Sequence, residues 1–173
     1  MNCKLRPDPL RNRLIMEENI QQKIIQILYM LKEIETALGE FYSRCAFFFP
    51  EDEQLWEELK SNEIRHAEQI DEIVTMVKEK TEKFLVGEFN PAALKTYLES
   101  IEDQRDSLEK GEINRNNALF IARDYENTLV EKQFHRAVKG VDPKFIHLTE
   151  IIEQEEREHL EKLNNYIKAI SIN

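Results

Sequence analysis

Apolar residues recur every three or four positions over most of the chain, which is the spacing of one face of an α-helix. The pattern predicts long helices over residues 14–49, 51–85, 113–139 and 143–170, and a shorter one over 91–108. The first range shows it most fully, with apolar side chains at Ile20, Ile24, Ile27, Leu28, Leu31, Ile34, Leu38, Phe41 and Tyr42. We therefore expect an all-α protein.

Turn signals divide these helices into two hairpins. Pro50 separates the first two long helices, and a Gly-Val-Asp-Pro sequence at 140–143 separates the last two. Between the hairpins, Asn90 and Pro91 predict an N-cap followed by proline in the first helical turn, and Gly111 predicts that helix's end. The expected fold is a ferritin-like four-helix bundle made of two antiparallel helical hairpins with a helical crossover.

The 173 residues fit one domain. Residues 1–13 are polar and contain two prolines, so we expect them to form a flexible N-terminal arm. The bundle should then occupy residues 14–173, with the crossover over about 87–112. Gly87 is expected to end the second long helix.

Charge and cysteine content exclude several classes of function. With 34 acidic and 24 basic residues the net charge is −10, which disfavours nucleic acid and anionic membranes as partners. The two cysteines, Cys3 and Cys45, form no C-x-x-C pair, so neither a thiolate metal site nor a disulfide scaffold is expected. The N-terminus has no apolar segment like that of a signal peptide, and we expect a soluble, cytoplasmic protein.

The two hairpins contain the same motif at the same distance from their turns. The second long helix contains Glu-Ile-Arg-His from Glu63 to His66, and the last contains Glu-Arg-Glu-His from Glu156 to His159. Glu63 follows Pro50 at the same sequence separation at which Glu156 follows the proline of the second turn, and the two histidines correspond in the same way. A repeated Glu-x-x-His with equal spacing indicates an internal repeat rather than two chance matches.

The first helix of each hairpin supplies a matching glutamate. Glu35 and Glu126 precede the prolines of their respective turns by nearly equal sequence separations. At ~1.5 Å per residue these positions and the motifs lie at a similar depth, roughly 20–25 Å from the turns. Glu33 and Glu40 remain alternatives to Glu35 if the helical register differs.

The spacing suits a two-metal site. Residues at i and i+3 share a helix face, so each motif presents one oxygen and one nitrogen ligand to the same point. Four carboxylates and two neutral imidazoles balance two divalent cations, whereas buried carboxylates without a cation would be costly. Oxygen and nitrogen ligands favour iron or manganese, and zinc could occupy the site in purified protein. The predicted metal ligands are Glu35, Glu63, His66, Glu126, Glu156 and His159.

The other acidic residues and histidines do not fall at these repeated positions. A single glutamate on a helix usually faces solvent, and we assign Glu40, Glu131, Glu155 and Glu158 to that class. His135 and His147 are expected at the surface or near the site without binding metal. Tyr42, two turns after Glu35, belongs to the core and lies within reach of the site.

The chain resembles the rubrerythrin-like branch of the ferritin superfamily over about residues 20–170. The resemblance rests on Glu35 followed by Tyr42 and Ala46, on Glu-Ile-Arg-His-Ala-Glu at 63–68, on residues 122–126, and on Glu-Arg-Glu-His-Leu at 156–160. It implies a di-iron site. Its terminal carboxylates are Glu35 and Glu126, its bridging carboxylates are Glu63 and Glu156, and its nitrogen ligands are His66 and His159.

The resemblance implies an oxidoreductase that reduces peroxide or dioxygen in an oxidative-stress setting. The four-cysteine rubredoxin module of classical rubrerythrins is absent, so electrons would come from a separate donor protein. The additional glutamate that rubrerythrins carry near Glu126 is not clearly reproduced. A homodimer is expected by analogy. Two alternatives stay open: a ferroxidase or iron-handling protein using the same site, and a non-catalytic helical interaction protein.

Overall fold

The computed structural model describes residues 9–87 and 90–171. Five α-helices account for most of them: α1 (Pro9–Phe48), α2 (Glu53–Glu79), α3 (Pro91–Glu109), α4 (Arg115–Lys132) and α5 (Pro143–Ile170). Short 3-10 turns at Pro50–Asp52, Thr81–Lys83 and Phe134–Ala137 and two short strands, β1 (Phe84–Val86) and β2 (Val138–Gly140), complete the described chain. The expected all-α class is confirmed.

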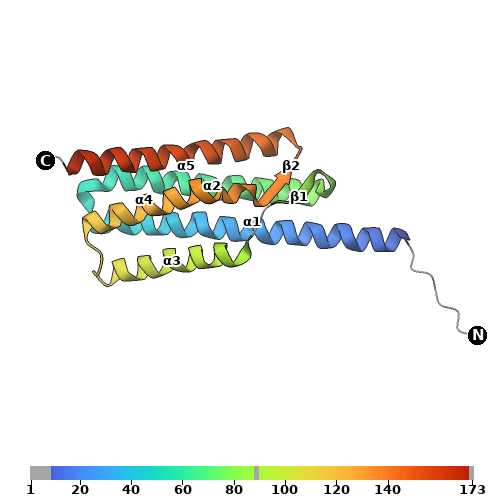
Figure 1. Cartoon of the computed structure of the whole chain (residues 1–173), viewed down its shortest axis with the longest axis horizontal. Coiled ribbons are helices and arrows are strands. Elements are labelled where there is room, and N and C mark those ends of the chain that lie inside the picture. The colour runs from blue at the N-terminus through green and yellow to red at the C-terminus, as the bar shows by residue number, and fades with distance from the viewer. Residues whose placement is uncertain (1–8, 88–89, 172–173) are drawn as a thin grey trace, which may run out of the picture.

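Four of the helices lie side by side, and the fifth lies outside them (Figure 1). α1 packs along α2, α4 packs along α5, and α2 contacts α5, so the two hairpins meet in one helical bundle. α3 packs on the outer side of α1 and carries the chain from one hairpin to the other. This is the hairpin, crossover, hairpin order that the turn signals predict.

Each helix of the two hairpins buries one face, and buried acidic or histidine side chains occupy the middle of that face. The buried stripe of α2 has helical spacing and consists of Leu55, Trp56, Leu59, Glu63, His66, Ala67, Ile70, Ile73, Val74 and Val77. The stripe of α5 consists of Phe145, Leu148, Ile152, Glu156, His159 and Leu163. In both helices the Glu-x-x-His motif therefore takes core positions, with apolar residues on either side along the helix.

Three helix ends differ from the expected ones by more than one helical turn. α1 begins at Pro9 rather than Leu14, because proline suits the first turn of a helix. The first eight residues of the expected arm, including Cys3, lie outside the described residues. α2 ends at Glu79 rather than near Leu85, and α4 ends at Lys132 rather than Lys139.

Each of the two shortened helices is followed by a 3-10 turn and a short strand. The two strands form a small antiparallel sheet that the apolar pattern did not predict. Phe84 pairs with Gly140 and Val86 with Val138, which ties the end of one hairpin to the other. Phe84 is buried against Phe145, with ring centroids 5.4 Å apart. A side chain at Gly140 would meet both rings at 2.8 Å. Long-range pairing thus overrides the local helical pattern here.

Gly87 does not end a helix. It follows β1, its N–H donates to the carbonyl of Ala137, and a Cβ at this position would lie 2.1 Å from the Arg136 carbonyl oxygen. The close approach of these two segments of the chain therefore requires glycine at this position. Within the described residues, no helix has the length and apolarity needed to span a membrane.

Candidate metal centre

All six predicted ligands are buried in the middle of the bundle. Glu35 comes from α1, Glu126 from α4, and the two Glu-x-x-His motifs come from α2 and α5. Their exposed fractions are between 0% and 5%, which is unusual for glutamate. Glu33 and Glu40 are exposed, so Glu35 is the one of these three that α1 directs inward.

Five of the six side chains form two groups that share one carboxylate. In the first group, His66 Nδ1 lies 3.3 Å from Glu63 Oε2 and 3.7 Å from Glu35 Oε2. In the second, His159 Nδ1 lies 3.3 Å from Glu63 Oε1 and 3.5 Å from Glu126 Oε2. Within each group the candidate ligand atoms lie within 4.8 Å of one another. Glu63 therefore directs one oxygen to each group, as a bridging carboxylate would.

The candidate ligand atoms that face one another in the two groups have no hydrogen-bond partner within the described part of the chain. They are Glu35 Oε2, both carboxylate oxygens of Glu63, His66 Nδ1, Glu126 Oε2 and His159 Nδ1. Buried polar atoms in proteins are almost always satisfied, and each exception calls for an explanation. A cation in each group would satisfy all six at once and offset the cost of burying the carboxylates. The residues therefore fit a pair of metal ions.

Burial and mutual charge shift the pKa values of these groups. Burial raises the pKa of the Glu35 and Glu126 carboxyls above the ordinary value. Burial acts on Glu63 in the same direction, but the two imidazoles, each 3.3 Å from one of its oxygens, outweigh burial and lower the pKa of Glu63. Burial opposes a charged ring, yet the neighbouring carboxylates raise the pKa of His66 to about 12 and of His159 to about 10. The cluster thus holds protons that a cation would displace.

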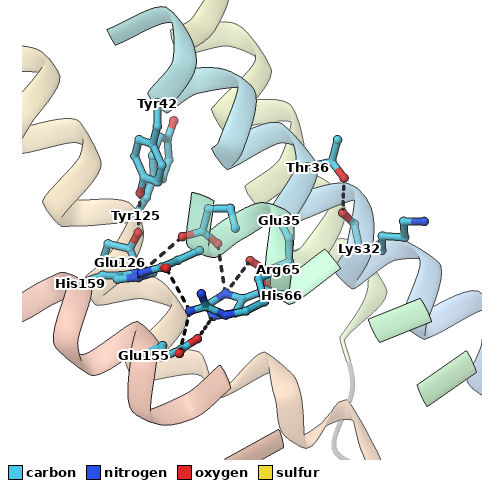
Figure 2. A network of polar contacts seen from close by, with 12 residues as sticks. Lys32, Glu35, Thr36, Tyr42, Arg65, His66, Tyr125, Glu126, Glu155 and His159 are labelled. Atoms are coloured by element: carbon cyan, nitrogen blue, oxygen red, sulfur yellow. Dashed lines mark hydrogen bonds and ion pairs between the residues drawn. The ribbon is translucent and has the colours of Figure 1, made fainter. Parts of the chain in front are cut away.

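Polar residues that are not predicted ligands contact the predicted metal ligands and orient them (Figure 2). The Tyr42 hydroxyl is buried and donates to Glu126 Oε1 at 2.5 Å, which leaves Oε2 directed at the second group. On the outer side of the rings, His66 Nε2 contacts Glu155 Oε2 at 2.8 Å, and His159 Nε2 contacts the Asn62 amide at 2.7 Å. Outer partners of this kind fix the tautomer and orientation of a ligating histidine.

The structure corrects the assignment of Glu155 to a solvated face. It is only partly exposed, and it contacts His66 directly. Asn62 was not predicted at all. Both residues directly precede a motif glutamate, and that shared position is the sequence signal that could have found them. Glu40, Glu131, Glu158 and His147 are exposed as expected, and the side chain of His135 lies outside the described residues.

Glu156 belongs to neither group but lies at a small cavity beside them. The cavity has a volume of about 30 Å³, and both Glu35 and Glu156 line it. The rest of its wall is apolar except for Thr149: Leu28, Leu31, Ile34, Ile70, Ile73, Leu129, Phe134, Val138, Phe145 and Ile152. It therefore extends from the two carboxylates toward the end of the bundle that carries the sheet.

The site repeats across the two hairpins: one carboxylate from the first helix, one Glu-x-x-His from the second, and one outer partner for each histidine. Comparison of the chain with protein-family models, with curated proteins and with solved structures finds no match in any of the three.

Proposed function

We propose that the protein is a di-iron oxidoreductase that reduces dioxygen or peroxide, with a ferritin-like, rubrerythrin-like bundle as its scaffold. The observation that carries the proposal is the position of Glu63, whose two oxygens face two separate groups of buried ligands. A single metal ion would fill one group and leave the ligand atoms of the other without a partner. In a purely structural helical protein, burying four carboxylates at one level would cost free energy with nothing to offset it.

The chain supplies the ligands and the surroundings of the pair. Glu35, Glu63 and His66 would hold one ion, and Glu63, Glu126 and His159 the other. Glu156 lies beside them, at the cavity that Glu35 also lines. The oxygen and nitrogen ligand set suits iron or manganese. When bound, two ferrous ions supply one electron each to the oxidant. Burial of every ligand keeps water from the site.

The cavity beside Glu35 and Glu156 supports a small, neutral oxidant. A cavity of about 30 Å³ accommodates no more than a few heavy atoms, which dioxygen and hydrogen peroxide satisfy. Its apolar wall favours dioxygen, because hydrogen peroxide would lose its hydrogen bonds to water on entry. The same wall disfavours the passage of hydrated iron ions, so the cavity supports an oxidoreductase over an iron-storage role.

Electrons for turnover would come from a separate donor protein, because the two cysteines of the chain cannot form a four-thiolate iron site. The donor is expected to reduce the metal pair after each reaction with the oxidant.

Anaerobic loading with Fe(II), followed by a limiting amount of dioxygen or peroxide, tests the proposal. We expect uptake of two Fe(II) per chain and a rapid rise in ferric absorption, with one peroxide consumed per two iron ions. Slow oxidation at the rate of Fe(II) in buffer would contradict an oxidoreductase. Continued oxidation and retention of many iron ions per chain would instead indicate iron storage.

A further inference from the structure

The outer partners of the two histidines are arranged alike across the two hairpins. Asn62 directly precedes Glu63 on α2 and contacts His159 on α5, with 2.7 Å between the amide nitrogen and Nε2. Glu155 directly precedes Glu156 on α5 and contacts His66 on α2, with 2.8 Å between Oε2 and Nε2. Each helix therefore supplies the outer partner for the other helix's histidine.

The two partners differ in charge and in the hydrogen bonds that they can make. Glu155 accepts at both oxygens, since Arg65 Nη2 donates to Oε1 at 2.7 Å while Oε2 faces His66 Nε2. A carboxylate accepts only, so the ring proton of His66 belongs on Nε2. A cation that displaces the proton on Nδ1 of His66 can therefore bind there, beside Glu35 and Glu63, while Nε2 keeps its bond to Glu155.

The surroundings of His159 are less suited to metal binding. Arg65 Nη2 also donates to Asn62 Oδ1, at 3.0 Å, which turns the amide nitrogen of Asn62 toward His159 Nε2. An amide N–H donates, so it favours the tautomer whose proton is on Nδ1, the atom that faces Glu63 and Glu126. Binding a cation through Nδ1 requires the Asn62 amide to turn and to lose its bond from Arg65. Asn62 also contributes no negative charge.

We propose that the two metal positions are unequal and fill in order, with the position formed by Glu35, Glu63 and His66 binding its divalent cation first and more tightly. Glu155 is the positioning residue that creates the difference, acting through His66. This inference rests on the proposed two-metal site and adds to it the order of loading.

Calorimetric and visible-absorption titration of the metal-free protein with Co(II) tests the order directly. The wild type should show two steps that differ at least tenfold in dissociation constant. His159→Ala should retain the tighter step, and His66→Ala should retain only the weaker one. Glu155→Gln should raise the dissociation constant of the first step about 10- to 100-fold and leave the second nearly unchanged, as expected for the loss of an outer partner.

Asn62→Asp separates this role from structural damage. It places a carboxylate of the same size behind His159, so the second step should tighten about tenfold, and a gain of affinity does not result from misfolding. Glu158→Gln removes one charge from an exposed position of the same helix as Glu155 and should change neither step. Circular dichroism and thermal unfolding establish that each variant is folded.

Two equal steps in the wild type would overturn the order. Equal shifts of both steps in Glu155→Gln, or no change in Asn62→Asp, would overturn the role of the outer partners while leaving the two-metal site intact. A folded wild type that binds no Co(II) would overturn the site itself, and the order with it.

Discussion

Tyr42 donates its buried hydroxyl to Glu126 Oε1 at 2.5 Å, and so links the aromatic core of the first hairpin to a candidate ligand of the second. The ring of Tyr42 also stacks on Trp56, with centroids 6.1 Å apart. The hydroxyl therefore fixes the orientation of the Glu126 carboxylate, and the ring anchors the hydroxyl in the core.

Tyr42→Phe should preserve the stacking and remove this hydrogen bond. Because Glu126 Oε1 would then be buried without a partner, the free energy of unfolding should fall by about 1–2 kcal/mol, measured by urea denaturation. Metal binding at the second position should also weaken. Tyr125→Phe is the matched control: its hydroxyl bonds to Ser100 on α3, so its loss should cost stability without changing metal affinity.

Metal binding should release protons. The neighbouring carboxylates raise the pKa of His66 to about 12, so this ring carries a proton on both nitrogens at pH 7 in the metal-free protein. A cation at Nδ1 of His66 displaces one of these protons, so metal affinity at this position should rise about tenfold per pH unit. Calorimetry at pH 7 in buffers of different ionisation enthalpy should show about one proton released with the metal ion that binds beside Glu35 and Glu63. A metal affinity independent of pH between 6 and 8 would contradict this account of the cluster.

Filling the cavity should slow the reaction with the oxidant without removing metal. Ile152 lines the cavity one turn before Glu156, so Ile152→Phe should narrow the space beside the carboxylates. Stopped-flow oxidation of the Fe(II)-loaded protein should be several-fold slower, with two metals still bound. Ile146→Phe, at an exposed position of the same helix, should react like the wild type. Equal rates in the two variants would show that the oxidant enters elsewhere.

A buried carboxylate outside the candidate metal centre, that of Asp52, stabilises the end of the bundle opposite the sheet. Asp52 accepts from Arg115 at 2.7 and 2.6 Å and from the Tyr166 hydroxyl at 2.5 Å, which joins the turn before α2 to α4 and α5. Asp52→Asn should lower the free energy of unfolding by about 2 kcal/mol. Metal stoichiometry should not change, because this cluster lies near the turn, far along α2 from Glu63. Elemental analysis beside urea denaturation checks both results.

The helices and the burial of the six candidate ligands on inward helix faces were predictable because both depend on local spacing. Glu63 and His66 share one helix face through their i, i+3 spacing, and the equal distances from the two turns place the motifs at one depth. The repeat between the hairpins indicated the matching residues on α1 and α4. No longer-range information was needed for either step.

The sheet and the outer partners were not predicted, because both depend on contacts between distant segments. Phe84 and Val86 continue a helical apolar pattern, and only their pairing with β2 turns them into a strand. Glu155 looks like any exposed glutamate until α5 is placed beside α2, where it meets His66. Tertiary contacts of this kind leave little trace in a single sequence.

The metal content of Glu63→Gln tests the central claim most directly, because Glu63 is the carboxylate that both groups share. Elemental analysis after Fe(II) loading and desalting should give two metals per chain for the wild type. The matched control Glu68→Gln, on the exposed face of the same helix, should also give two. Glu63→Gln should lose both ions together while remaining folded by circular dichroism. Retention of two ions would contradict the shared carboxylate, and retention of one would show that the two groups bind independently.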